Sequence, residues 1–168
     1  MSAKSSFFQR VQPFLPVRIL VFIVNLFAKE KFKLFNGKLY VNGNNKKHFI
    51  LKDRIAIYRK GLDFRGSMLG KSYHLDLVAF YPSDLVIDVG ANVGDLLLYL
   101  PDYIQYIGVE PSPVEFDLLS KNTKSNCRAY KVAATNKNSM TNFFIASPEA
   151  DSSLIEPPNY SEKLASQV

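Results

Sequence analysis

The sequence is poor in residues on which many active sites depend. It has one cysteine, Cys127, and two histidines, His48 and His74. One cysteine excludes an internal disulfide, so we expect a reducing compartment, the cytoplasm. We expect Cys127 to be a buried apolar residue and not a nucleophile, because neither histidine has a companion motif that would make it a base. We therefore assign no catalytic residue, and we expect no metal site.

The sequence also lacks a long uninterrupted apolar run. Its most apolar segment, residues 14–28, is interrupted by Pro16, Arg18 and Asn25, whereas about 20 apolar residues are needed to cross a bilayer. We interpret this segment as a helix that packs on the protein or lies on a membrane surface, ended by the basic residues of 29–33. An export signal is the alternative, although its cleavage pattern is poor.

Acidic residues are scarce in the first part of the chain. Residues 1–60 hold thirteen Lys and Arg against two acidic residues, whereas residues 61–168 hold eight against thirteen. Such a basic leader predicts an anionic surface as partner, with a solvated basic face as the alternative. We expect peripheral membrane contact through residues 14–28 and do not expect nucleic acid. The chain is thus divided into a basic N-terminal helix and β-hairpin region, residues 1–60, and a domain of residues 61–168.

Asparagine–glycine pairs predict tight hairpins in the first region. Asn36-Gly37 and Asn42-Gly43 separate short apolar runs, and such pairs favour two-residue turns between antiparallel strands. We predict strands over residues 38–41, 48–51 and 54–58. Residues 46–48 are then the tip of a loop.

One stretch of the second region carries a ligand-binding pattern. Residues 85–89 predict a fully buried strand, residues 90–94 a glycine-bearing turn, and residues 96–100 a short helix behind Asp95. Open α/β sheets bind ligands at such turns, and the acid that holds ribose hydroxyls follows about 20 residues later. Glu110 has that position, at the end of a second short strand that we predict over residues 106–110.

The charges of this stretch favour a cationic nucleoside over a dinucleotide. The middle glycine of G-x-G-x-x-G is missing, and Asp95 lies where a diphosphate would approach and would repel it. A dehydrogenase is therefore the disfavoured alternative. Asp88, Asp95 and Glu110 predict an acidic pocket, which suits S-adenosylmethionine with its sulfonium and ammonium groups.

The same residues resemble the FkbM family of S-adenosylmethionine-dependent methyltransferases. The resemblance covers residues 54–155 and is carried by Val-Ile-Asp-Val-Gly-Ala-Asn-Val-Gly at 86–94, Val-Glu-Pro-Ser-Pro at 109–113 with Leu119 and Asn122 after it, Val-Ala-Ala at 132–134 and Ser-Ser-Leu at 152–154. It implies a class I methyltransferase with a Rossmann-like α/β sheet. It also implies O-methylation of a hydroxyl on a small metabolite or saccharide.

The cofactor-binding residues that we predict lie in these motifs. Two glycines permit close backbone approach, and a glutamate can accept hydrogen bonds from both ribose hydroxyls. For Asp88 the alternative is a structural carboxylate that bonds the turn's own amides. Asp151 is the candidate catalytic base, but we assign it no role. The predicted set is Asp88, Gly90, Ala91, Asn92, Gly94, Glu110, Pro111 and Ala133.

The rest of the second region predicts half of the family's sheet. We expect helices over residues 66–80 and 113–124, strands over 128–133 and 140–146, a substrate-side loop over 147–158, and nothing definite over 160–168. The family's sheet has seven strands, and its fourth strand carries a motif resembling K-I-D-x-E-G that this sequence lacks.

The expected fold class is therefore α/β, a partial Rossmann-like class I methyltransferase sheet with an N-terminal helix and a small antiparallel β decoration. Strand 85–89 would have an exposed edge, which favours oligomerisation. The alternative function is a non-catalytic, truncated or split methyltransferase-like module that retains at most cofactor binding.

Overall fold

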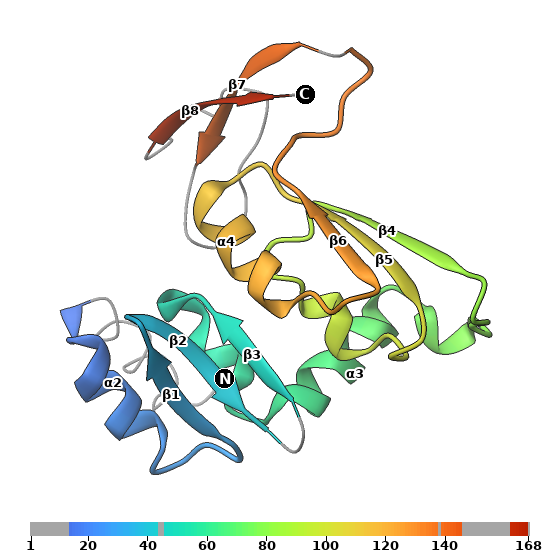
Figure 1. The fold of residues 1–168 in the computed structure, drawn as a ribbon. Coiled ribbons are helices and arrows are strands. Elements are labelled where there is room, and N and C mark those ends of the chain that lie inside the picture. Colours follow the sequence, from blue (N-terminus) through green and yellow to red (C-terminus); the bar gives the residue numbers. More distant parts are fainter. Residues whose placement is uncertain (1–13, 44–45, 138, 146–161, 168) are drawn as a thin grey trace. The chain divides into compact units, whose positions relative to one another are not determined.

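The computed structural model describes residues 14–43, 46–137, 139–145 and 162–167 (Figure 1). The chain falls into two compact units that divide between Arg65 and Gly66. Helix α3, Leu62–Ser72, runs across this division. Within the described ranges, no helix combines the length and the apolar character needed to cross a bilayer.

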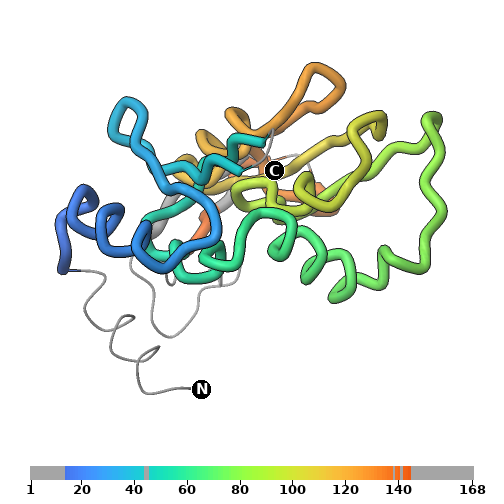
Figure 2. Tube along the Cα trace, turned by 90° about the horizontal axis from the view of Figure 1, so that it is seen from below, coloured from blue at the N-terminus to red at the C-terminus, as the bar shows by residue number. Residues whose placement is uncertain are grey.

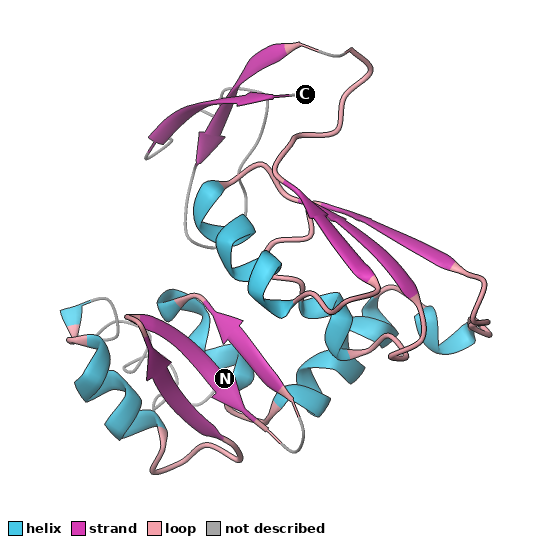
Figure 3. Ribbon diagram, in the orientation of Figure 1, coloured by secondary structure: helices cyan, strands magenta, loops and turns pink. Residues whose placement is uncertain are grey.

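The first unit is a three-stranded antiparallel sheet in the order β1-β2-β3, with helical segments before and after it (Figure 3). Its elements are α2 Val17–Val24, β1 Lys31–Phe35, β2 Lys38–Asn42, β3 Lys47–Ile50 and the 3-10 helix η2 Lys52–Tyr58. Asn36 and Gly37 both have positive φ, 48° and 76°, as a two-residue turn between twisted strands requires. The Asn-Gly hairpin predicted at this place is confirmed.

The residue after helix α2, Asn25, binds the neighbouring strand through its side chain. Asn25 Oδ1 accepts from Phe32 N at 2.8 Å, and Asn25 Nδ2 donates to Phe32 O at 2.9 Å. Leu20 and Val24 of α2 are 0% and 1% exposed. One side of α2 therefore belongs to the core of this unit.

Three expectations for the first unit are wrong. Residues 54–58 lie in the 3-10 helix η2 and not in a strand. Residues 29–33 do not end a helix, because β1 begins at Lys31 and its lysines alternate with the buried Phe32. Residues 46–48 are not a loop tip, since His48 lies in β3 and is 3% exposed. Its imidazole packs by the Tyr58 ring, with 6.1 Å between ring centroids.

The second unit contains a three-stranded parallel sheet in the order β4-β5-β6. This mixed α/β architecture confirms the expected class at the level of a partial parallel sheet. Its elements, beyond most of α3, are η3 Leu75–Leu77, β4 Leu85–Val89, η4 Asp95–Leu98, β5 Gln105–Val109, α4 Pro113–Asn122, β6 Cys127–Tyr130, β7 Met140–Ile145 and β8 Glu162–Gln167.

The predicted elements of this unit are confirmed where their signals are local. Strands β4 and β5 and helix α4 lie where the sequence places them, and the crossover from β5 through α4 to β6 can be followed in Figure 2. The helix expected over residues 66–80 ends at Ser72, and β6 ends at Tyr130. Residues 162–167, for which nothing definite was expected, pair with β7 as strand β8. The predicted loop 147–158, with Asp151, lies outside the described residues.

One face of the parallel sheet carries the core of the second unit. Ala91, Leu100, Tyr106 and Leu119 form a buried cluster, at most 5% exposed, that joins the turn after β4, strand β5 and helix α4. The prediction that β4 is fully buried is wrong, because Leu85, Ile87 and Val89 are 49%, 60% and 63% exposed. Their side chains alternate with those of Val86 and Asp88, which are half-buried. Strand β4 is also an edge strand, paired only with β5 among the described strands.

Candidate functional site

The carboxyl ends of β4 and β5 lie next to each other. The parallel register pairs Asp88 with Gly108 and Val89 with Val109. Beyond β4, the N–H groups of Gly90 and Ala91 both donate to the Val109 carbonyl, at 2.9 and 3.0 Å. The turn after β4 is therefore held against the end of β5.

The turn itself is built from left-handed residues. Gly90, Asn92 and Gly94 have φ values of 77°, 51° and 81°. A Cβ at Gly94 would lie 2.8 Å from Leu119 Cδ1, whereas a Cβ at Gly90 would meet nothing within 4 Å. The two glycines thus differ in role, because Gly94 permits helix α4 to pack and Gly90 leaves its backbone open.

Glu110 is the residue that joins the turn to the next strand end. Its Oε2 accepts from Asn92 N and its Oε1 from Ser112 N, each at 2.9 Å, while its own N–H donates to Tyr130 O at 3.0 Å. A carboxylate offers about four lone-pair sites. Glu110, which is 6% exposed, therefore retains acceptor capacity beyond these two amide bonds.

The environment of Glu110 favours further hydrogen-bond donors. Burial raises the pKa of Glu110 above its ordinary value, and the N–H groups of Ser112 and Asn92 oppose that rise. The charges of Glu115 and Asp88 add to it. Each additional hydrogen bond to the ionised carboxylate lowers its free energy. A ligand that brings hydroxyl donors would have this effect.

Asp88 is bound by a tyrosine of the neighbouring strand. The Tyr106 hydroxyl donates to Asp88 Oδ2 at 2.8 Å. Burial raises the pKa of Asp88, this hydrogen bond lowers it, and the negative charge of Asp95 raises it again. Burial and Asp88 also raise the pKa of the Tyr106 hydroxyl, which therefore stays a donor. Asp88 thus bonds the Tyr106 hydroxyl, whereas the alternative of a structural carboxylate expected it to bond the turn's own amides.

Tyr106 was missed by sequence reasoning, although a signal was present. A Cβ at Gly108 would lie 2.9 Å from Tyr106 Cε1, so the tyrosine ring passes over Gly108. Gly108 is the register partner of Asp88. The signal for the Tyr106–Asp88 hydrogen bond is thus a tyrosine two residues before a glycine, on the strand that pairs with the aspartate's strand.

The remaining predicted residues have different surroundings. Ala91 is 5% exposed and part of the core cluster, so its backbone is what a ligand could reach. Pro111 is half-buried directly after Glu110. Ala133 is 7% exposed and follows the end of β6. Asn122 ties α4 to the turn, since its Nδ2 donates to Val93 O at 2.7 Å.

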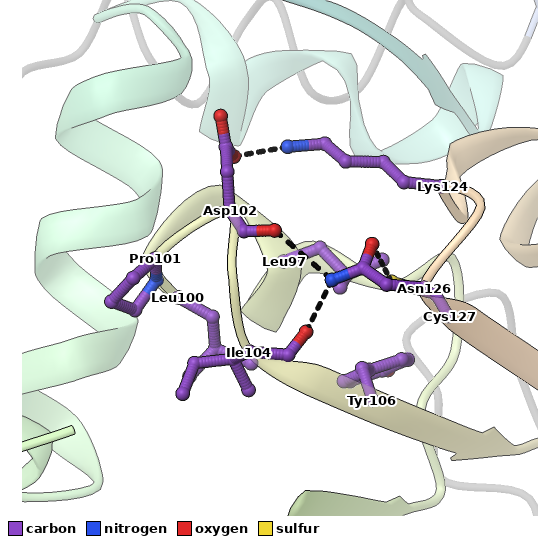
Figure 4. Close-up of a pocket in the computed structure, with 9 residues that line it drawn as sticks. All are labelled: Leu97, Leu100, Pro101, Asp102, Ile104, Tyr106, Lys124, Asn126 and Cys127. Carbon is purple, nitrogen blue, oxygen red and sulfur yellow. Dashed lines mark hydrogen bonds and ion pairs between the residues drawn. The ribbon is translucent and has the colours of Figure 1, made fainter. Parts of the chain in front are cut away.

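A small hollow lies at the amino ends of β5 and β6 (Figure 4). Asn126 Nδ2 donates there to the carbonyls of Asp102 and Ile104, at 3.0 and 2.6 Å, and Lys124 pairs with the Asp102 carboxylate. The hollow has room for about one water, about 10 Å³. These contacts brace the loop before β5, and the hollow is too small for a nucleoside.

No family model, curated protein or solved structure matches this chain. The resemblance to the FkbM family therefore rests on the motif residues alone. Over the residues that the structure describes, no group of three or more His, Cys, Asp or Glu is arranged to hold a metal ion.

Proposed function

We propose that this chain is an S-adenosylmethionine-dependent methyltransferase module of the FkbM type, acting on a hydroxyl of a small metabolite or saccharide. The observation that carries the proposal is the 2.9 Å hydrogen bond from Asn92 N to Glu110 Oε2. This hydrogen bond joins the open glycine turn to a buried acid at the carboxyl ends of β4 and β5, where α/β folds bind ligands. The single cysteine favours the cytoplasm as its compartment.

The residues at this edge suit the cofactor's chemistry. Gly90, with open space beside it, would allow the methionine part to lie against the backbone, and Glu110 would accept from the ribose hydroxyls. The carboxylates of Asp88, Asp95 and Glu110 suit a ligand with cationic groups. S-adenosylmethionine supplies a methyl group already activated by its sulfonium. The protein then has to position the acceptor hydroxyl and remove its proton.

Calorimetric titration of the chain with S-adenosylmethionine tests the cofactor site. We expect binding by the wild type and weaker binding by Gly90→Ala, because the added methyl occupies space that the ligand would need. Overpacking of this kind costs about 1–3 kcal/mol, which is about 5- to 150-fold in Kd.

Gly37→Ala is the matched control for this variant. Gly37 has φ 76° and Gly90 has φ 77°, and a Cβ at either meets nothing within 4 Å. Both variants therefore introduce the same backbone strain. Gly37 lies in the hairpin of the first unit, away from the proposed cofactor site in the sequence. Absence of binding by the wild type, or an equal loss in both variants, would contradict the proposal.

The alternative is a non-catalytic module that binds the cofactor without transferring the methyl group. The exposed outer side of β4, at Leu85, Ile87 and Val89, favours it, because parallel sheets are ordinarily covered on both faces. Incubation with methyl-labelled S-adenosylmethionine and a panel of hydroxyl compounds separates the two. Transfer of label supports the enzyme, and calorimetric binding without transfer supports the module.

A further inference from the structure

Helix α2 has apolar residues on two opposite sides. Leu20 and Val24 are buried, whereas Ile19, Phe22 and Leu26 are 48%, 68% and 62% exposed. Positions i, i+3 and i+7 lie on one side of a helix, and the chain keeps turning beyond α2, since Leu26 N donates to Ile23 O at 3.2 Å. A helix on the surface of a globular protein ordinarily has polar residues on its solvent-facing side. We call Ile19, Phe22 and Leu26 the outer stripe.

Two more exposed aromatic residues flank α2 in the sequence. Phe14 is 86% exposed and Phe27 is 71% exposed. Large exposed apolar patches mark interaction sites. The outer stripe, which is apolar where a surface helix is ordinarily polar, is the candidate for such a site.

Positive charge lies at the C-terminal end of the outer stripe. Lys29, Lys31 and Lys60 are exposed. Lys29 N donates to Arg59 O at 3.0 Å, which brings residues 59–60 beside the chain that leaves α2, and Lys31 Nζ donates to Asn25 O at 3.3 Å. The one acid between them, Glu30, accepts from Leu62 N at 2.8 Å. Apolar side chains and lysines therefore border each other.

We propose that the first unit docks on an anionic lipid bilayer through the outer stripe of α2. The apolar side chains would enter the boundary between headgroups and acyl chains, and the lysines would meet lipid phosphates. Each lysine near an anionic leaflet contributes about 1 kcal/mol. A nucleic acid would attract the lysines but would leave the aliphatic side chains of the stripe in water. A lipid surface accounts for both the apolar and the basic residues, and it is independent of any methyl transfer.

Co-sedimentation of the full chain with vesicles tests this docking. We expect binding to vesicles made of equal parts phosphatidylglycerol and phosphatidylcholine, and much weaker binding to phosphatidylcholine alone. The double variant Phe22→Gln/Leu26→Gln should lower partitioning at least about tenfold, because two large apolar side chains are lost from the lipid contact. Leu77→Gln is the matched control. Leu77 is 81% exposed in the second unit, and its variant should bind as the wild type does.

A second variant keeps the test decisive should the first one fail to fold. Lys29→Gln/Lys60→Gln removes two exposed charges, together with the contact of Lys60 Nζ with the Phe64 ring at 4.5 Å. It should weaken binding to the anionic vesicles, with an unchanged circular dichroism spectrum. Equal binding to both vesicle types, or wild-type binding by either double variant in its folded form, would overturn the proposal. Binding of labelled poly-deoxythymidine without vesicle binding would overturn it in favour of nucleic acid.

Discussion

Burial disfavours the ionised form of Asp88, and its hydrogen bond with Tyr106 offsets this only in part. Its pKa in the folded chain is raised above the ordinary 3.8, with burial as the largest cause. The folded chain therefore binds this proton more tightly than the unfolded chain does. The protonated Asp88 therefore adds to the free energy of unfolding. This contribution is complete below the ordinary pKa and is lost as the pH rises through the raised pKa.

Replacing Asp88 tests this linkage. We expect Asp88→Asn to gain stability relative to the wild type between about pH 3 and about pH 7, because the variant has no carboxyl to ionise. Tyr106→Phe should lose stability relative to the wild type over the same range, since it removes the donor that holds the pKa of Asp88 down. Urea unfolding across this range measures both. Parallel pH profiles for all three proteins would show that Asp88 is not the titrating group.

The two turn glycines should differ in their tolerance of a side chain. Both Gly90→Ala and Gly94→Ala carry left-handed strain, of about 1–2 kcal/mol. Gly94→Ala adds a contact of 2.8 Å with Leu119 Cδ1. Such overpacking costs a further penalty of about 1–3 kcal/mol. We expect a lower urea midpoint for Gly94→Ala than for Gly90→Ala. In a Leu119→Val background the extra cost should shrink, and a cost unaffected by Leu119 would refute the packing explanation.

At the scale of elements, Glu30 acts as a distant cap for helix α3. Its Oε2 accepts from Leu62 N, the first residue of that helix, at 2.8 Å. We expect Glu30→Ala to lower the free energy of unfolding by about 1–2 kcal/mol, because a helix N–H loses its partner.

Glu30→Gln keeps an acceptor and should lose less. Asp63→Ala, in the first turn of the same helix, removes a charge near the helix N-terminus and should cost at most about 1 kcal/mol, screened by salt. Chemical denaturation at low and high salt distinguishes the hydrogen bond from the charge. A Glu30→Ala effect that vanishes in salt would mean that Glu30 acts only as a charge.

Sequence predicts those elements whose signals are local. The Asn36-Gly37 turn and the strand, turn and helix around residue 90 follow from residues that favour one backbone conformation. Sequence reasoning misses β1, because lysines that alternate with buried residues resemble the basic charges that end a helix. It also misses β8, whose pairing with β7 joins segments distant in the sequence. An apolar run such as Leu85–Val89 fixes a strand, but whether both faces are covered depends on distant residues.

The candidate site was predictable to a similar degree. The positions of Gly90, Asn92 and Glu110 come from motif spacing, and the parallel register brings them together. The hydrogen bonds that set their electrostatics were not evident. They come from Tyr106 and Ser112, which reach the site through cross-strand packing and a backbone amide.

At the scale of the whole molecule, the exposed side of β4 predicts self-association. Leu85, Ile87 and Val89 form an apolar row on an edge strand, and such edges pair with other chains. We expect sedimentation to show a concentration-dependent oligomer that Ile87→Lys reduces. Val114→Lys is the control, because Val114 is similarly exposed, at 59%, but lies on α4. An equal response of both variants would place the contact elsewhere.

The left-handed turn after β4 has a further consequence for inheritance. Three positive-φ residues within five positions restrict the side chains that the backbone can accept there, whatever the turn binds. Because the N–H groups of Gly90 and Ala91 hold the end of β5 through the Val109 carbonyl, folding by itself is enough to select for this backbone shape. A related chain could therefore keep the motif without keeping any ligand.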